Sequence, residues 1–353
     1  MGHVHANFGK PLYLREHLDR FAEGWEETDI DNNDKPQWLV PTVNALGERI
    51  LKRINRAVVL DPVNLLSYVL LSTPRLHMGE KELARSIDKL IQLQSVAPYA
   101  PELVLPSERG EQIVTYVESF NMLDRQNHAL GDTLTPLGKN AILMSYYRNN
   151  IQHAFALPSL IAAIFLDNKP LSKERVTELV AMAYPYIQQE LFLRYEQDEI
   201  GEAVSQQLNA MREVELLQYD EKKKLWSRYP AESPHATELE NLAQGMLQTL
   251  GRYYLLLVLL VRYGKNGIKQ VDLENLVHQS AQQMSRLHDI SSPEFFDKRL
   301  FQGFIRLLKQ NDLVDVNEEG YMHYKPEMLK YREDADSVLS ERYRQVVYRV
   351  IYA

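Results

Sequence analysis

The sequence contains no cysteine among its 353 residues. This absence excludes disulfide bridges, thiolate nucleophiles and cysteine-ligated zinc sites together, and it is compatible with a reducing cytosol. Glycine is also sparse, at 15 residues, and the sequence has no glycine-rich phosphate loop and no nucleophile-elbow serine. The ten histidines show no metal-ligand spacing. We therefore expect no metal and no cofactor.

Basic residues are outnumbered by acidic ones, and long apolar runs are scarce. The 40 lysines and arginines face 48 aspartates and glutamates, for a net charge of -8, which argues against a nucleic-acid partner. The longest apolar runs are Ala154 to Leu166 and Tyr253 to Val261. Both fall short of the roughly 20 residues that span a membrane. We expect them to be buried core helices, with no transmembrane helix and any membrane contact at the surface.

The first residues predict a strand. Residues His3 to Leu14 alternate and contain Gly9 and Pro11, as in a strand that ends in a turn. A lone strand is not stable in water, so we expect the sequence to begin inside a domain. The acidic, polar stretch Glu23 to Gln37 is typical of a linker.

From Pro41 the pattern becomes helical, with apolar residues every three or four positions up to Val58. The more polar side of this helix is basic. A basic amphipathic helix can lie on an anionic membrane surface, although a solvated face or a contact with another domain would look the same. The membrane-surface candidates are Arg49, Lys52, Arg53 and Arg56.

The rest of the chain predicts a structural repeat. Three times, an apolar helix is followed by a polar break, two further helices and a hairpin; the hairpins are expected at Asn121 to Thr135, Glu215 to Tyr229 and Asp312 to Tyr324. This order is that of a winged helix. We therefore predict a mainly α fold with short β-hairpins (α+β), built of tandem winged-helix-like units. The alternative is an irregular helical domain with three unrelated hairpins.

The expected domain organisation follows from this repeat. At roughly 150 residues per domain, the length suggests two to three domains. We place the tail of a preceding domain and a linker at 1–36, unit 1 at 37–140, unit 2 at 141–232, and unit 3 with a C-terminal helix at 233–353. Because winged helices often bind DNA, a tandem module that contacts nucleic acid or protein is the alternative function, although the net charge favours a structural or protein-binding role.

The densest polar cluster leads into the second apolar helix. It could bind a phosphate or an acyl-carrier partner, or it could satisfy helix-start amides and pack against another domain. Its candidates for contact with substrate or a domain interface are Tyr147, Arg148, Asn149, Asn150 and His153.

Several strings, in this order along the chain, resemble one enzyme family. Asn7-Phe8-Gly9-Lys10-Pro11 is similar to the strand that closes the catalytic domain of glycerolipid acyltransferases. Trp38 to Asn44, Arg53-Ile54-Asn55, Asn64-Leu65, Tyr146 to Ile151 with His153, Leu157 to Leu160, Glu190 to Arg194 and Pro293 to Lys298 resemble the region after that domain. The whole set resembles the C-terminal part of the large, membrane-associated bacterial glycerol-3-phosphate 1-O-acyltransferases.

This resemblance implies a role in the first step of phospholipid synthesis. In that family, acyl carrier protein or acyl-CoA thioesters acylate glycerol 3-phosphate to lysophosphatidic acid at the cytoplasmic face of the inner membrane, with a His-x4-Asp motif as the catalytic base and its orienting partner. None of the ten histidines here has an aspartate five residues on. We therefore identify no catalytic residue, expect the chain to begin after the catalytic blocks, and expect its main partner to be an N-terminal catalytic domain.

Overall fold

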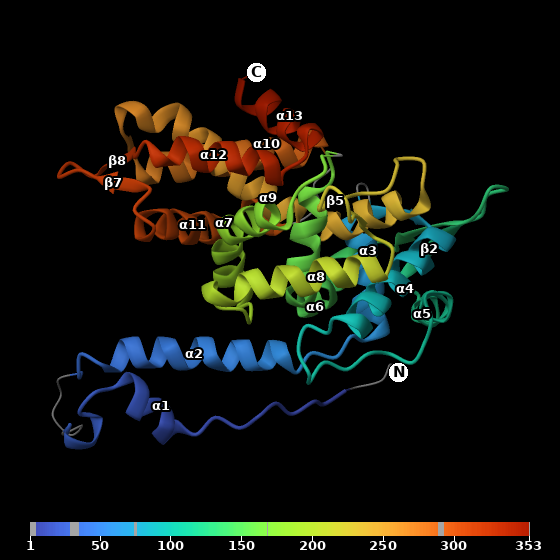
Figure 1. Cartoon of the computed structure of the whole chain (residues 1–353), viewed down its shortest axis with the longest axis horizontal. Helices are drawn as coiled ribbons and strands as arrows, with labels where there is room; N and C mark the ends of the chain where they lie inside the picture. Colours follow the sequence, from blue (N-terminus) through green and yellow to red (C-terminus); the bar gives the residue numbers. More distant parts are fainter. Residues whose placement is uncertain (1–4, 29–34, 74–75, 168, 289–292, 353) are drawn as a thin grey trace.

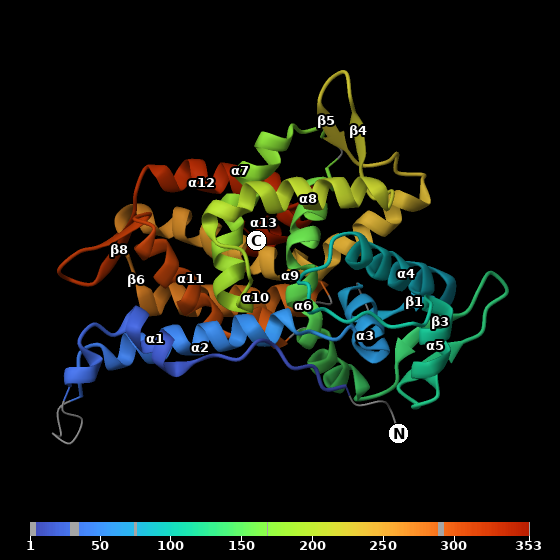
Figure 2. The ribbon, with the colours of Figure 1, turned by 60° about the horizontal axis from the view of Figure 1, so that its bottom comes forward.

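The computed structural model describes residues 5–28, 35–73, 76–167, 169–288 and 293–352. Two helices at the amino end, α1 (Leu14–Phe21) and α2 (Leu39–Arg56), lie along one edge of the molecule (Figures 1 and 2). A single 3-10 turn, η1 (Trp25–Glu27), follows α1. The rest is helical with three small antiparallel sheets, so the predicted mainly α fold with short hairpins is confirmed.

The first unit has the element order of a winged helix. Its sheet has the order β1-β3-β2, with Leu134 of the central strand between Met78 and Arg125. The arrangement therefore joins a strand before the second helix to the hairpin after the third. The elements are α3 (Pro62–Ser72), β1 (Met78–Gly79), α4 (Glu80–Val96), α5 (Gly110–Glu118), β2 (Leu123–Gln126) and β3 (Thr133–Pro136).

The third unit repeats this topology, with the sheet order β6-β8-β7 and Met322 of β8 between Ile268 and Val316. Its elements are α9 (Pro234–Tyr263), η4 (Gly264–Asn266), β6 (Ile268–Lys269), α10 (Gln270–His288), η5 (Pro293–Phe296), α11 (Lys298–Gln310), β7 (Val314–Val316) and β8 (Tyr321–Tyr324). Two helices, α12 (Glu327–Val338) and α13 (Glu341–Tyr352), follow.

The second unit is a reduced version of the same plan. Its first strand is replaced by an isolated antiparallel bridge between Leu171 and Trp226. The predicted threefold repeat is therefore present, with this local simplification. Its elements are α6 (Asn140–Ile164), α7 (Lys173–Leu191), η3 (Gln197–Glu199), α8 (Ile200–Glu213), β4 (Gln218–Asp220) and β5 (Leu225–Ser227).

The first helices of the three units form the centre of the core. Residues 65–72 of α3, 153–164 of α6 and 249–260 of α9 are buried on every side. A helix that is apolar all round belongs in an interior, so the two longest apolar runs are core helices as predicted. Among the described residues, no helix is long and apolar enough to cross a membrane.

Two expectations about helix and strand positions are wrong. The described part of the predicted strand, residues 5–13, is extended but pairs with no strand, and α1 already begins at Leu14. The polar cluster does not lead into the second core helix but lies inside it, because α6 begins at Asn140. His3 falls outside the described residues.

Candidate functional site

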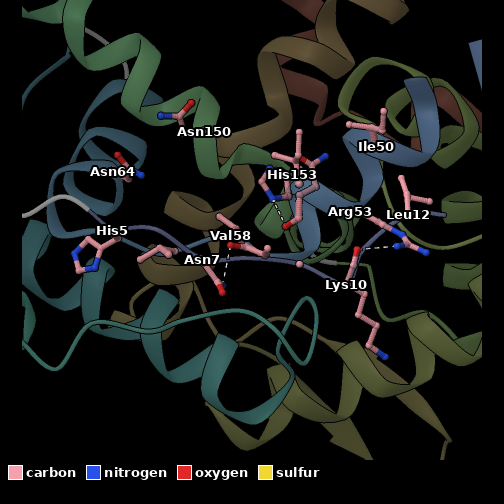
Figure 3. Close-up of a pocket in the computed structure, with 15 residues that line it drawn as sticks. His5, Asn7, Lys10, Leu12, Ile50, Arg53, Val58, Asn64, Asn150 and His153 are labelled. Atoms are coloured by element: carbon pink, nitrogen blue, oxygen red, sulfur yellow. Dashed lines mark hydrogen bonds between the residues drawn. The ribbon is translucent and has the colours of Figure 1, made fainter. Parts of the chain in front are cut away.

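A cavity of about 510 Å³ lies where the amino-terminal segment crosses the end of α2 (Figure 3). Four stretches of chain that are distant in sequence form its wall: residues 5–12, the last turns of α2 with the three residues after it, the start of α3, and the middle of α6. The wall is rich in amide and basic side chains. The lining residues used below are His5, Asn7, Leu12, Ile50, Arg53, Ile54, Asn55, Asn64, Asn150 and His153.

Residues 5–13, which we call the strap, are held by side chains rather than by a sheet. Asn7 Nδ2 donates to Ala57 O at 3.0 Å and to Glu102 O at 2.8 Å. Arg53 Nη1 donates to Lys10 O at 2.7 Å and also to Pro11 O. The Arg53 bonds satisfy strap carbonyls that a neighbouring strand would otherwise have to pair, and the Asn7 side chain anchors the strap to carbonyls outside it. They explain why an alternating sequence forms no strand here.

His153 joins α6 to the end of α2. Its Nε2 donates to Asn55 O at 3.0 Å, and its ring meets the edge of Tyr99 at 5.1 Å between centroids. Asn55 in turn donates to Leu191 O at 2.8 Å and to Phe192 O at 3.1 Å, which ties α2 to the end of α7. Burial lowers the pKa of His153 to about 4, against the opposing hydrogen bond to Asn55. This histidine is therefore neutral at pH 7 and positioned as a packing residue.

The free energy of unfolding of the chain should depend on pH, because burial disfavours protonation of His153 in the folded state. Its pKa is about 4 when folded and 6.5 as the ordinary value, so below pH 6.5 the unfolded chain takes up a proton that the folded chain does not. The free energy of unfolding should then fall by about 1.4 kcal/mol per pH unit, or about 3 kcal/mol in total, as pH falls to 4 and below. Below the folded pKa the loss stops.

The variant His153→Gln keeps an amide donor for Asn55 O and removes the titration. Urea unfolding of both proteins at several pH values between 7 and 4 measures the difference in their free energies of unfolding. We expect the advantage of the wild type to shrink steadily over this range. A difference that stays constant with pH would contradict the assignment to His153.

The four membrane-surface candidates are each engaged within the chain. Lys52 Nζ lies 2.8 Å from both Glu48 Oε1 and Glu196 Oε1; burial lowers its pKa, but these hydrogen bonds and charges outweigh burial and raise it. Arg56 lies 3.4 Å from Glu102, and Arg49 lies 2.8 Å from the imidazole Nδ1 of His17. Arg53 donates to the strap carbonyls. Membrane contact through these residues stays a prediction.

The cavity separates the polar cluster into two groups. Its described lining includes Asn150 and His153, but not Tyr147, Arg148 or Asn149. Tyr147 packs against the hydrophobic core, and Arg148 donates to Asn149 Oδ1 from Nε at 3.0 Å and from Nη2 at 2.9 Å. The five candidates therefore do not all line this cavity, and their contact with a substrate or a domain interface stays a prediction.

Sequence reasoning named Asn150 but missed the other three asparagines in the described cavity wall. Asn7, Asn55 and Asn64 stand in three separate strings that carried the family resemblance, and each lines the cavity together with Asn150 (Figure 3). The common feature of these strings, one asparagine in each, was the signal that could have found them. Metal ligands are a different matter, because the described residues contain no cluster of three or more histidines and carboxylates that could hold a metal ion.

Comparison with known proteins assigns the family. Residues 1–317 match the glycerol-3-phosphate acyltransferase C-terminal region. A glycerol-3-phosphate acyltransferase of Pseudomonas fluorescens is 39% identical over 323 residues, which are 92% of this chain and 38% of the relative. One from Pseudomonas putida is 38% identical over 350 residues, 99% of this chain and 42% of the relative.

The chain thus spans about two fifths of the length of these relatives. Nothing in the matches supports the alternative of a nucleic-acid-binding module. The winged-helix topology is shared by proteins with many functions, and topology alone does not assign one. The match over most of the chain assigns the family: this protein belongs to the glycerol-3-phosphate acyltransferase C-terminal regions.

Proposed function

We propose that this chain is a non-catalytic module of a glycerol-3-phosphate 1-O-acyltransferase, and that the remainder of the enzyme supplies the chemistry. The observation that carries this proposal is that none of the ten histidines has an aspartate five residues on. Attack of the substrate hydroxyl on a thioester needs a proton acceptor within hydrogen-bond reach. A chain without the family's base and its orienting partner should not provide one.

The two described histidines that line the cavity, His5 and His153, are also poor candidates for the proton acceptor. His153 is buried, and its Nε2 is bound to Asn55 O. His5 Nε2 stands 3.6 Å from Asp61 Oδ2, which is too long for a hydrogen bond, and Asp61 also caps α3 through Val63 N. His153, whose Nε2 is bound to a backbone carbonyl, does not have the geometry of a base held by an orienting carboxylate.

In the complete enzyme, the first hydroxyl of glycerol 3-phosphate would attack the carbonyl of an acyl thioester. The thiol of acyl carrier protein or coenzyme A would leave, and lysophosphatidic acid would enter phospholipid synthesis. The module would pack on the catalytic part at the cytoplasmic face of the inner membrane as a peripheral protein. Within it, we propose units at 37–140, 141–232 and 233–353, after an amino-terminal stretch at 1–36.

An acyltransferase assay tests this proposal. Purified residues 1–353 are incubated with glycerol 3-phosphate and either acyl-CoA or acyl-acyl carrier protein, and lysophosphatidate is measured by mass spectrometry. We expect no product above the rate without protein, because the base is absent. Turnover by this chain alone would overturn the assignment of a non-catalytic role.

A further inference from the structure

Exposed apolar side chains are concentrated at the amino end of the chain. Of the 22 large hydrophobic residues that are exposed in the described structure, nine lie between residues 8 and 54. Val43 and Ile54 of α2 are 56% and 61% exposed. Single exposed apolar residues are normal on a protein surface, but a contiguous set marks an interaction site. The exposed large apolar residues of α2 are Val40, Val43, Ile50, Leu51 and Ile54.

Four of these residues, Val40, Val43, Ile50 and Ile54, form one stripe along α2 with Gly47 between them. With 3.6 residues per turn, residues 40, 43, 47, 50 and 54 fall within about a third of the helix circumference. We call Val40, Val43, Gly47, Ile50 and Ile54 the α2 stripe. Its spacing alternates between three and four residues, the pattern of a helix that packs lengthwise against another helix. Gly47 has no atom within 4 Å of its Cβ position, so a partner could approach closely there.

The other two sides of α2 are already occupied. On one side, Thr42 Oγ1 donates to Phe21 O of α1 at 2.9 Å, and Arg49 contacts His17. On another, Asn55 and Lys52 bond to the end of α7 and to Glu196. The stripe is the third side, and it faces away from both layers. The described part of the chain therefore uses two sides of α2 and leaves its apolar side uncovered.

The stripe runs into the cavity described above. Ile50 and Ile54 belong to the stripe and also line the cavity, as does Leu12 of the strap. Figure 3 shows Leu12 and Ile50 in this wall. An occupant of the stripe would therefore reach the asparagines of the wall at its end. The strap itself lies against α2 through Arg53. The amino end of the described strap, His5, lines the same cavity.

The observations favour a protein occupant over lipid or a second copy. The relatives carry about three fifths of their length outside the matched part, and the family match is to a C-terminal region, so in them that length lies before the strap. The four basic residues on the other sides of α2 already have partners within the chain, which weakens their attraction for anionic lipid.

We propose that the α2 stripe and the adjoining cavity form the docking surface for an amphipathic helix from the preceding, catalytic part of the acyltransferase. This inference rests on the proposed function and names the surface through which the module would act. The helix would place apolar side chains at three- and four-residue spacing against the stripe. Its polar end would bond with the amides of the cavity wall.

The absence of cysteine in the chain allows a direct test. Single cysteines are introduced by Val43→Cys in the stripe and, as a matched control, by Val271→Cys on α10, where valine is 65% exposed. Each is placed in the isolated chain and in chimeras in which this chain replaces the matched region of the Pseudomonas fluorescens or the Pseudomonas putida relative. Maleimide labelling rates are read from the mass of the labelled peptide, and acyl transfer by each chimera is measured in parallel.

In the isolated chain, both cysteines should react at similar rates, because both are exposed thiols. In an active chimera, the thiol of Val43→Cys should react roughly tenfold more slowly than in the isolated chain, since the core of an interface excludes solvent. The labelling rate of Val271→Cys should not change. Equal rates for Cys at 43 in the isolated chain and in an active chimera would overturn the docking surface but leave the proposed function standing. Two inactive chimeras would count against the proposed function, and the docking proposal would fall with it.

Two further arms separate the other occupants. The isolated chain is labelled with and without vesicles of phosphatidylethanolamine and phosphatidylglycerol, and over a range of protein concentrations. Protection of Cys at 43 by vesicles would identify a lipid occupant, and protection that rises with concentration would identify a second copy. Either result would overturn the proposal, which expects labelling to be the same in all of these conditions.

Discussion

Replacing Arg252 by methionine is expected to lower the free energy of unfolding by about 3–5 kcal/mol, because the change leaves a carboxylate without its cation inside the protein. Arg252 of α9 is 2% exposed. Its Nη2 lies 2.5 Å from both carboxylate oxygens of Glu190 on α7. Burial opposes the charge of Arg252, but Glu190 more than offsets it and raises the pKa of the guanidinium. Urea unfolding followed by circular dichroism measures the loss.

The companion variant removes both charges. In Arg252→Met with Glu190→Leu, the hydroxyl of Tyr253 loses its bond to Glu190 at 2.6 Å but keeps Tyr186 O as an acceptor at 3.2 Å. We therefore expect the double variant to be more stable than Arg252→Met alone, as replacement of a buried ion pair by apolar groups often is. Equal or additive losses would show that the pair is not the source of the effect.

An exposed ion pair serves as the control for this prediction. Arg15 Nη2 lies 2.5 Å from Glu26 Oε1, as short as the buried pair, but the two side chains are 75% and 57% exposed. Arg15→Met should change the stability by less than about 1 kcal/mol, because water solvates both charges when the pair is broken. The contrast isolates burial, rather than distance, as the reason for the expected loss at Arg252.

The repeated topology could be predicted from the sequence because its signals are local. Each hairpin is marked by turn residues between two β-prone runs, and Asn317 to Gly320 between β7 and β8 is the clearest case. Long apolar runs in the sequence predict the core helices. What the sequence hid was their length: α6 extends back to Asn140 and α9 to Pro234, where exposed polar faces alternate with buried positions and the apolar run has not yet begun.

The strap and the cavity could not be predicted, because they depend on tertiary contacts. The alternation in residues 5–13 is typical of a strand, but two side chains hold this segment instead: Arg53 bonds to its backbone, and its own Asn7 bonds to Ala57 O. The cavity brings Asn7 together with Asn150 from a distant part of the chain. Residue type alone also could not show that His153 binds a backbone carbonyl.

The second large effect is expected at Gly110, the first residue of α5, which packs against α4. A Cβ atom added there would lie 2.0 Å from Ala84 O and 2.7 Å from Ala84 C, both of which belong to the backbone of α4. Because a backbone inside a helix cannot yield as a side-chain tip can, α5 would have to move away. That shift would strain the 2.7 Å hydrogen bond from Gly110 N to Asp88 Oδ1. Gly110→Ala should therefore destabilise the chain by about 3 kcal/mol or more.

A second glycine separates this clash from the general effect of alanine in a helix. Gly303 lies in the middle of α11, and nothing approaches within 4 Å of its Cβ position. Gly303→Ala should stabilise the chain by about 0.5–1 kcal/mol, since alanine loses less backbone freedom on folding. Urea unfolding of both variants should thus give shifts of opposite sign. Shifts of the same sign would mean that the close approach of α5 to Ala84 does not limit the packing of the first unit.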